Sequence, residues 1–130
     1  MSKRENAIQR DVLAAIGAEP DLLLLRNNVG EAEHVNEDSG RIYRVAYGLG
    51  VGSPDLVGIL APSGRWFCLE LKQPGEKPRK GQRECHAAWR KFGAFVAVVT
   101  SVDEAKAAIQ AARGEGERGY ARAITREKGQ

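Results

Sequence analysis

The stretch GVGSPDLVGILAPSGRWFCLELK, residues 50–72, decides the fold. It holds two apolar runs, PDLVGIL and RWFCLELK, separated by the turn sequence APSG, and this pattern predicts a β-hairpin. Asp55 opens the first run, while Glu70 and Lys72 lie among the apolar residues of the second. Because alternate side chains of a strand share a face, we expect Glu70 and Lys72 to point the same way. The hairpin brings Asp55 close to them.

Charged side chains inside apolar strands are costly to bury unless they have partners. Two carboxylates that converge at the end of a sheet can bind a hard divalent cation, and the carbonyl of Leu71 can supply another oxygen ligand. A lysine beside such a cation can position a water molecule and stabilise negative charge on a phosphate. This set of groups is suited to phosphodiester hydrolysis. The ordinary alternative is an exposed Glu-Lys strand pair and a turn aspartate, because E-x-K alone is a common tripeptide.

The rest of the sequence predicts a mixed β-sheet flanked by helices. Helical spacing of apolar residues predicts helices over residues 5–16, 82–92 and 102–113. Further strands are predicted over residues 21–29, 41–48 and 93–100. In the second of these strands, Ile42, Val45 and Tyr47 are available for packing. Residues 30–40, GEAEHVNEDSG, predict an acidic, mobile loop.

The length of 130 residues is typical of one domain. We expect this domain over residues 1–113, followed by a charged, glycine-containing tail over residues 114–130. Apolar runs such as residues 22–25 are too short to span a membrane, and the N-terminus lacks the apolar segment of a secretory signal. Two cysteines form no disulfide framework, which favours the cytoplasm of a bacterial or phage-infected cell.

Basic residues are concentrated just after the hairpin. The segment 77–91 has six lysines and arginines against the single acid Glu84, although the net charge of the chain is only +3. A local cluster of this kind attracts phosphates. The residues expected to hold a DNA backbone are Lys77, Arg79, Lys80 and Arg83.

The motifs GSPDLVGIL and LELK resemble the core of PD-(D/E)XK nucleases. More narrowly, the chain resembles the VRR-NUC family, the virus-type replication-repair nucleases. That family has an acid on its N-terminal helix, a G-x-P-D strand, an E-x-K strand and a glutamine on the following helix. The matching residues, in this order, are Glu5, Asp55, Glu70, Lys72 and Gln82. The resemblance covers roughly residues 3–100.

The resemblance implies a restriction-endonuclease-like α/β core and a DNA nuclease that uses Mg²⁺ or Mn²⁺. It implies metal binding by Asp55, Glu70 and the Leu71 carbonyl, with Glu5 as a further carboxylate, and catalysis by Lys72 and Gln82. It also implies a homodimer that acts on branched DNA, such as a Holliday junction, in replication, repair or recombination. Glu5 has a second explanation, because an acid in the first turn of a helix complements the helix dipole.

Three other interpretations remain at this point. The chain could be a restriction-type endonuclease of the same superfamily, or a DNA-binding module whose acids are structural. A dinucleotide-binding protein is disfavoured because Ser53 replaces the last glycine of the G-x-G-x-x-G fingerprint in GLGVGS. His34 and His86 lack a companion cluster and are expected to be structural or exposed. The polar residues Asn27, Asn28 and Arg44 are expected to serve as ordinary loop and strand residues, with a DNA contact near the same edge as the alternative.

Overall fold

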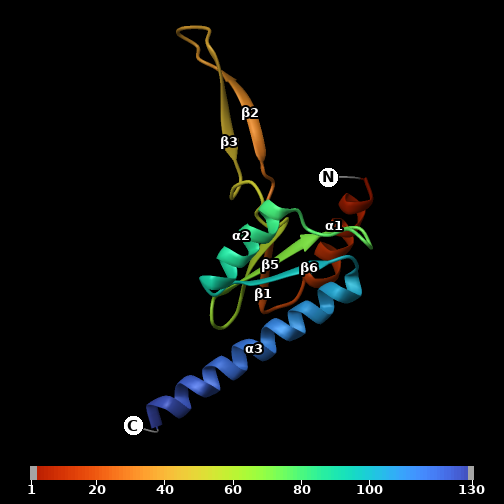
Figure 1. The fold of residues 1–130 in the computed structure, drawn as a ribbon, viewed down its shortest axis with the longest axis vertical. Helices are drawn as coiled ribbons and strands as arrows, with labels where there is room; N and C mark the ends of the chain where they lie inside the picture. Colours follow the sequence, from red (N-terminus) through yellow and green to blue (C-terminus); the bar gives the residue numbers. More distant parts are fainter. Residues whose placement is uncertain (1–2, 129–130) are drawn as a thin grey trace.

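The computed structural model describes the backbone of residues 3–128 and the side chains of residues 3–115. The elements, in chain order, are α1 (Lys3–Ile16), β1 (Leu22–Arg26), β2 (Gly30–Val35), β3 (Ile42–Tyr47), β4 (Leu56–Leu60), β5 (Arg65–Leu71), α2 (Lys80–Lys91), β6 (Phe95–Val99) and α3 (Val102–Lys128). Figure 1 shows a body of sheet and helices from which β2 and β3 project at one end and the second half of α3 at the other. No helix among the described residues is long and apolar enough to cross a membrane.

The body is built on a four-stranded mixed sheet with the order β1-β4-β5-β6. β4 pairs antiparallel with both β1 and β5, and β5 pairs parallel with β6. The hairpin predicted from residues 50–72 is therefore β4 and β5, and α2 connects the parallel pair. The predicted α/β class with a mixed central sheet is confirmed.

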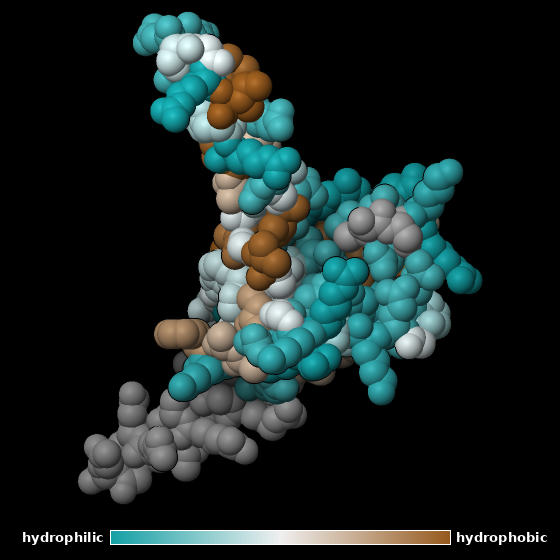
Figure 2. Space-filling view, turned by 45° about the horizontal axis from the view of Figure 1, so that its top comes forward, coloured by the Kyte–Doolittle hydropathy of each residue, from teal (hydrophilic) through white to brown (hydrophobic). Residues whose placement is uncertain are grey.

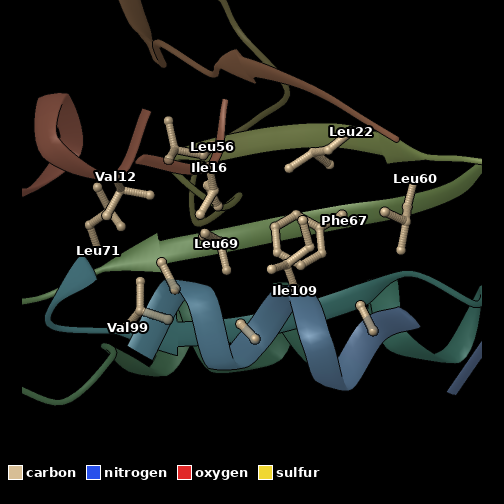
Figure 3. Packing of buried hydrophobic residues seen from close by; sticks show 13 residues of the cluster. Val12, Ile16, Leu22, Leu56, Leu60, Phe67, Leu69, Leu71, Val99 and Ile109 are labelled. Atoms are coloured by element: carbon tan, nitrogen blue, oxygen red, sulfur yellow. The ribbon is translucent and has the colours of Figure 1, made fainter. Parts of the chain in front are cut away.

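Helices α1 and α3 cover one face of this sheet. Figure 3 shows Val12 and Ile16 of α1 beside Leu71 and Leu69 of the inner strand β5, and Ile109 of α3 beside Phe67 of the same strand. Val12 and Ile16 are one helical turn apart, so both reach the sheet, and both are fully buried. The periodicity that predicted α1 therefore marks the face that forms the core.

Helix α2 lies against the opposite face of the sheet. Its buried residue is His86, and its Trp89 meets Trp66 of β5 edge to face, with ring centroids 5.4 Å apart. The side chains of Cys68, Glu70 and Lys72 alternate with the core residues of β5 and so face α2. Burial raises the pKa of Cys68 to about 12, which keeps this sulfur a neutral thiol.

The predicted acidic loop over residues 30–40 is wrong, because residues 30–35 form β2. β2 pairs antiparallel with β3 in a separate two-stranded sheet. The expected packing of Ile42, Val45 and Tyr47 is also wrong, since these side chains are 65%, 40% and 49% exposed. Both errors have one cause: β3 finds its hydrogen-bond partner in the acidic segment next to it and never joins the central sheet. We call residues 30–47 the arm (Figures 1 and 2).

The last helix is longer than the sequence predicts. The predicted end at Arg113 is followed by continuous helix to Lys128, so the expected tail over residues 114–130 begins as part of α3. No proline interrupts this segment, and single glycines weaken a helix without ending it. Side chains beyond residue 115, and residues 129–130 entirely, lie outside the described residues, so the division into domain and tail stays a prediction.

Candidate active site

The site begins where β4 and β5 meet. Leu56 pairs with Leu69, so Asp55, one residue earlier, lies opposite Glu70, one residue later. Asp55 Oδ2 accepts a hydrogen bond of 2.8 Å from the backbone N–H of Leu71. The side-chain carboxylate of Asp55 thus accepts the hydrogen bond that a backbone carbonyl would accept if the pairing of β4 and β5 continued. The hairpin register alone fixes the position of Asp55 relative to the second strand.

Glu70 is 2% exposed and is surrounded by polar groups from two elements. Gln82 Nε2 of α2 donates a hydrogen bond of 2.9 Å to Glu70 Oε1, and Lys72 Nζ lies 3.8 Å from the same oxygen. The other oxygen, Oε2, lies 3.5 Å from His86 Nε2, and neither of these two atoms has a hydrogen-bond partner. Gln82 and His86 are four residues apart, so one face of α2 carries both to Glu70.

Asp55 is held in an environment that opposes its negative charge. Burial raises the pKa of Asp55 to about 6, and the nearby charges of Glu70 and Glu5 act in the same direction. The hydrogen bond from Leu71 and the charge of Lys72 act the other way but are weaker. Glu5 on α1 is therefore near enough to repel Asp55. The structure brings three carboxylates to one region: Glu5 on α1, Asp55 before β4 and Glu70 on β5.

Asn27, directly after β1, holds the segment that leads into β4, residues 53–55. Its backbone N–H donates to the Asp55 carbonyl at 2.8 Å, and its Nδ2 donates to Ser53 Oγ and the Pro54 carbonyl at 2.7 and 2.8 Å. Its Oδ1 accepts from the N–H of Leu49 at 3.1 Å. One side chain thus ties the base of the arm to the segment that positions Asp55.

A cleft of about 660 Å³ opens over Asp55. Its walls come from α1, the end of β1, the base of the arm and the start of α2, and its lining residues include Gln9, Tyr47, Asp55, Arg79 and Gln82. The start of α2 forms part of this wall, and the positive end of a helix dipole favours an anion nearby. A phosphate could therefore approach Asp55 from the cleft.

No family model matches the sequence, and no curated protein matches it. A solved structure described as a "VRR_NUC domain" matches the fold with a TM-score of 0.56 and 25% sequence identity. The match covers 84% of this chain and 97% of that chain. The predicted resemblance to the VRR-NUC family is supported by this match. The match supports a nuclease of the PD-(D/E)XK superfamily, which agrees with the geometry of Asp55, Glu70 and Lys72.

The residues carrying the VRR-NUC motifs all come to this site. Asp55, Glu70, Lys72 and Gln82 are linked by the contacts above, and Glu5 acts on Asp55 through its charge. The catalytic and metal-binding roles assigned to them from the resemblance stay predictions. The Leu71 carbonyl lies in the same strand end, between Glu70 and Lys72.

The predicted DNA-binding residues lie in the loop before α2 and in its first turn. Arg79 lines the cleft, and Lys77, Lys80 and Arg83 are exposed beside it. Lys80 Nζ lies 3.8 Å from Glu84 Oε1, and Arg83 donates to the Pro78 carbonyl at 2.7 Å. Of the four cations, Arg79 lines the cleft, and the other three are exposed in the same loop and first turn of α2.

Nucleases of the PD-(D/E)XK superfamily generally use divalent metals. Among the described side chains, no group of three or more His, Cys, Asp or Glu residues is arranged to hold a metal ion. Two observations nevertheless fit a hard cation between the strands. Glu70 Oε2 is buried without a hydrogen-bond partner, and Asp55 and Glu70 repel each other in a way that a cation would relieve.

Sequence reasoning underestimated His86 and Asn27. His86 was expected to be structural or exposed, and it is buried against Glu70. Its spacing of four residues from Gln82 is the signal that could have placed it there. Asn27 was expected to be an ordinary polar residue, and only the tertiary structure brings it to Ser53 and Asp55. His34 and Arg44 lie on the arm; Arg44 pairs with Glu31 at 3.2 Å.

Proposed function

We propose that this protein is a nuclease of the VRR-NUC type that depends on Mg²⁺ or Mn²⁺ and cuts branched DNA during replication, repair or recombination. The observation that carries the proposal is the meeting of Asp55, Glu70 and Lys72 at one end of β4 and β5, next to a polar cleft that Arg79 lines. A purely structural strand pair would leave these charges at the surface, whereas Glu70 and Lys72 are 2% and 8% exposed.

Asp55, Glu70 and the Leu71 carbonyl are the groups that would hold the cation, with Glu5 as a further carboxylate. When bound, the cation supplies Lewis-acid stabilisation of the charge that develops on the phosphate. Lys72, held beside Glu70, orients the attacking water and adds positive charge near the leaving oxygen. Gln82 keeps Glu70 in position, and Lys77, Arg79, Lys80 and Arg83 hold the DNA backbone without reading its sequence.

Replacement of Lys72 by methionine tests this function. The methionine retains an unbranched apolar stem, so we expect a folded protein that binds DNA and cleaves at least 100-fold more slowly than the wild type. Rates are measured on a four-way junction, a flap and a linear duplex of the same sequence, with Mg²⁺, Mn²⁺ or EDTA. The nuclease proposal would be abandoned if Lys72→Met cleaved at the wild-type rate.

The same assay separates the remaining interpretations. A restriction-type endonuclease would cut the linear duplex at a defined sequence, and it would cut branched DNA no faster. A DNA-binding module with structural acids would cut none of the substrates, and its binding would not respond to Asp55→Asn. Preferential cutting of the junction or flap is the expected result for the proposed function.

We further propose that the protein acts as a homodimer in the cytoplasm of a bacterial or phage-infected cell. The location is supported by two cysteines that are both free. The dimer is supported by an apolar area on the α2 side of the sheet, where no described helix covers β1 and β4. Leu23, Ile59 and Trp66 lie side by side in the strand register and are 55%, 46% and 45% exposed. An uncharged surface of this kind suits self-association.

Substitution of Ile59 by lysine tests the dimer. The change places one positive charge at the centre of the apolar area, so we expect a shift from dimer to monomer in sedimentation equilibrium. Val51→Lys is a matched control, because Val51 is 94% exposed and lies in the linker before β4. An identical mass for the wild type and Ile59→Lys would rule out this surface as the interface.

A further inference from the structure

The proposed function leaves the arm without a role. Every residue of β3 is exposed, and the arm forms a two-stranded sheet of its own (Figure 1). Two-stranded hairpins are marginally stable in water, so a projecting one is expected to gain stability from something that it contacts. Figure 2 shows hydrophobic surface along the arm, away from the body of the protein.

The two faces of the arm differ in chemistry. The strand register places Glu31, Glu33 and Arg44 on one face, together with Val35 and Ile42. Arg44 contacts Glu31 at 3.2 Å and Glu33 at 4.0 Å, so the charges on this face are partly satisfied by one another. The other face, which we call the aromatic face, has no acidic, lysine or arginine side chain. Its members are Ala32, His34, Tyr43, Val45 and Tyr47.

The aromatic face is continuous with the cleft over Asp55. Tyr47 lines that cleft. Its ring also lies over Gly30 on the neighbouring strand, where an added Cβ would come within 2.4 Å of the tyrosine hydroxyl. Farther along, His34 and Tyr43 stack with ring centroids 5.7 Å apart and planes 24° from parallel. Tyr43 and Tyr47 are four residues apart, about 13 Å along the strand, so aromatic surface reaches from the cleft out along the arm.

We propose that this aromatic face stacks the unpaired bases of a branched DNA next to the phosphate that is cut. Any base can stack on an aromatic ring, so such a surface holds single-stranded DNA without reading its sequence. The absence of carboxylates on the face lets a strand approach it. The acids Glu37 and Asp38 lie in the turn of the arm and Glu31 and Glu33 on the reverse face, where they repel phosphates.

This assignment rests on the proposed nuclease function and deepens it, because it identifies the feature of DNA that the protein distinguishes. A continuous duplex offers phosphates and stacked pairs, which the aromatic face cannot engage. A branch point offers unstacked bases within reach of both the arm and the cleft. A second copy of the chain is a less suitable occupant, since the aliphatic sheet face around Ile59 provides a more apolar surface for it.

The test compares Tyr43→Ala with two controls. Tyr43→Phe keeps the ring, and Ile42→Thr changes a 65% exposed side chain on the reverse face while keeping a β-branched residue. Binding is measured in EDTA at fixed salt, so that no DNA is cut. The probes are a splayed duplex with unpaired arms and a fully paired duplex of the same sequence. A 2-aminopurine in the unpaired arm next to the branch reports stacking.

We expect Tyr43→Ala to weaken binding to the splayed DNA about 10-fold, in keeping with the 1–3 kcal/mol that base–aromatic stacking contributes. The 2-aminopurine fluorescence should fall when the wild type and Tyr43→Phe bind, and much less with Tyr43→Ala. Ile42→Thr should match the wild type. Circular dichroism of each variant checks that the fold is retained.

Three results would overturn the assignment: unchanged binding of the splayed DNA by Tyr43→Ala, an equal loss on the paired duplex, or an equal loss in Ile42→Thr. A change in molecular mass of Tyr43→Ala without a change in DNA binding would overturn it in favour of a second copy. The binding data do not depend on cleavage. If the wild type cleaves DNA and Tyr43→Ala binds it normally, only the role of the aromatic face is refuted. If the wild type never cleaves DNA, the nuclease function is refuted.

Discussion

At Asp55, the proposed activity requires a negative charge that lowers the stability of the folded protein. Its pKa is raised to about 6 by burial and by Glu70, so the metal-free protein folds more favourably when this carboxyl is neutral. Protonation therefore stabilises the folded state below about pH 4, the ordinary aspartate range, and this contribution is lost as the pH rises through 6. The charge that costs stability is the one that the proposed cation would need.

Asp55→Asn should consequently stabilise the metal-free protein while abolishing cleavage. The asparagine Oδ1 can still accept the hydrogen bond from Leu71, and we expect a gain of roughly 1–2 kcal/mol at pH 7.5 that disappears toward pH 4. Urea unfolding between pH 4 and 8 measures it. Asp11→Asn, at an exposed site on α1, serves as the control. A loss of stability at pH 7.5 in Asp55→Asn would contradict the raised pKa.

The residues of the two strands could be predicted from the sequence, because alternation in a strand and a hairpin turn already place Asp55, Glu70 and Lys72 together. The partners of Glu70 could be predicted only in part. Gln82 was found through the family resemblance, whereas His86 requires knowing which face of α2 meets the sheet. Asn27 could not be found, since its contacts join segments that are 22–27 residues apart.

Among the elements, the glycine-rich link before β4 joins the arm to the site. Gly52 has φ of +87°, and a Cβ at this position would lie 2.7 Å from the Gly81 carbonyl oxygen in the first turn of α2. The link is therefore more than the flexible connector that its composition suggests. It lets the segment before Asp55 approach the helix that carries Gln82.

Gly52→Ala should lower the free energy of unfolding by about 1–3 kcal/mol and slow cleavage, because α2 must shift away from Asp55. Gly50→Ala is the matched control. Gly50 also has a positive φ of +102°, but nothing lies within 4 Å of the added Cβ. It should cost about 1 kcal/mol and leave cleavage nearly unchanged. Equal effects of the two substitutions on cleavage would show that contact with α2 is unimportant.

The elements of the body were predictable because each has a distinct apolar period, as with Val12 and Ile16 on α1 and the two runs of β4 and β5. β2 was missed because GEAEHV has alternating acids and little apolar content, which resembles a loop. Its strand conformation depends on pairing with β3, a tertiary effect outside the range of local propensity. The same pairing decides that Ile42 and Tyr47 are exposed.

For the whole molecule, α3 is anchored to the turn between α1 and β1. Arg113 donates to both carboxylate oxygens of Asp21, at 2.8 and 2.6 Å, and to Glu19 at 3.0 Å. The Arg113 guanidinium holds the pKa of Asp21 below its usual range, so this bridge stabilises the fold above about pH 4 and is lost as the pH falls further. Beyond this point α3 leaves the body (Figure 1).

Arg113→Ala should lower the stability by about 1 kcal/mol, since these partly exposed pairs are screened by solvent, and should lower the melting temperature by roughly 3–5 °C. Arg113→Lys keeps the charge without the two-pronged geometry and should recover part of the loss. Calorimetry at pH 7 and pH 3 measures both. A destabilisation that is as large at pH 3 as at pH 7 would exclude the ionic contact as its source.

The edge-to-face contact of Trp66 and Trp89 has a practical consequence. The chain contains only these two tryptophans, and both report on the same seam between β5 and α2. Intrinsic tryptophan fluorescence therefore reports on the packing of α2, the helix that carries Gln82 and His86, against the sheet. No fluorescent label is needed. Titrating magnesium or DNA into the unmodified protein would make that movement visible in real time, separately from the unfolding of the opposite layer.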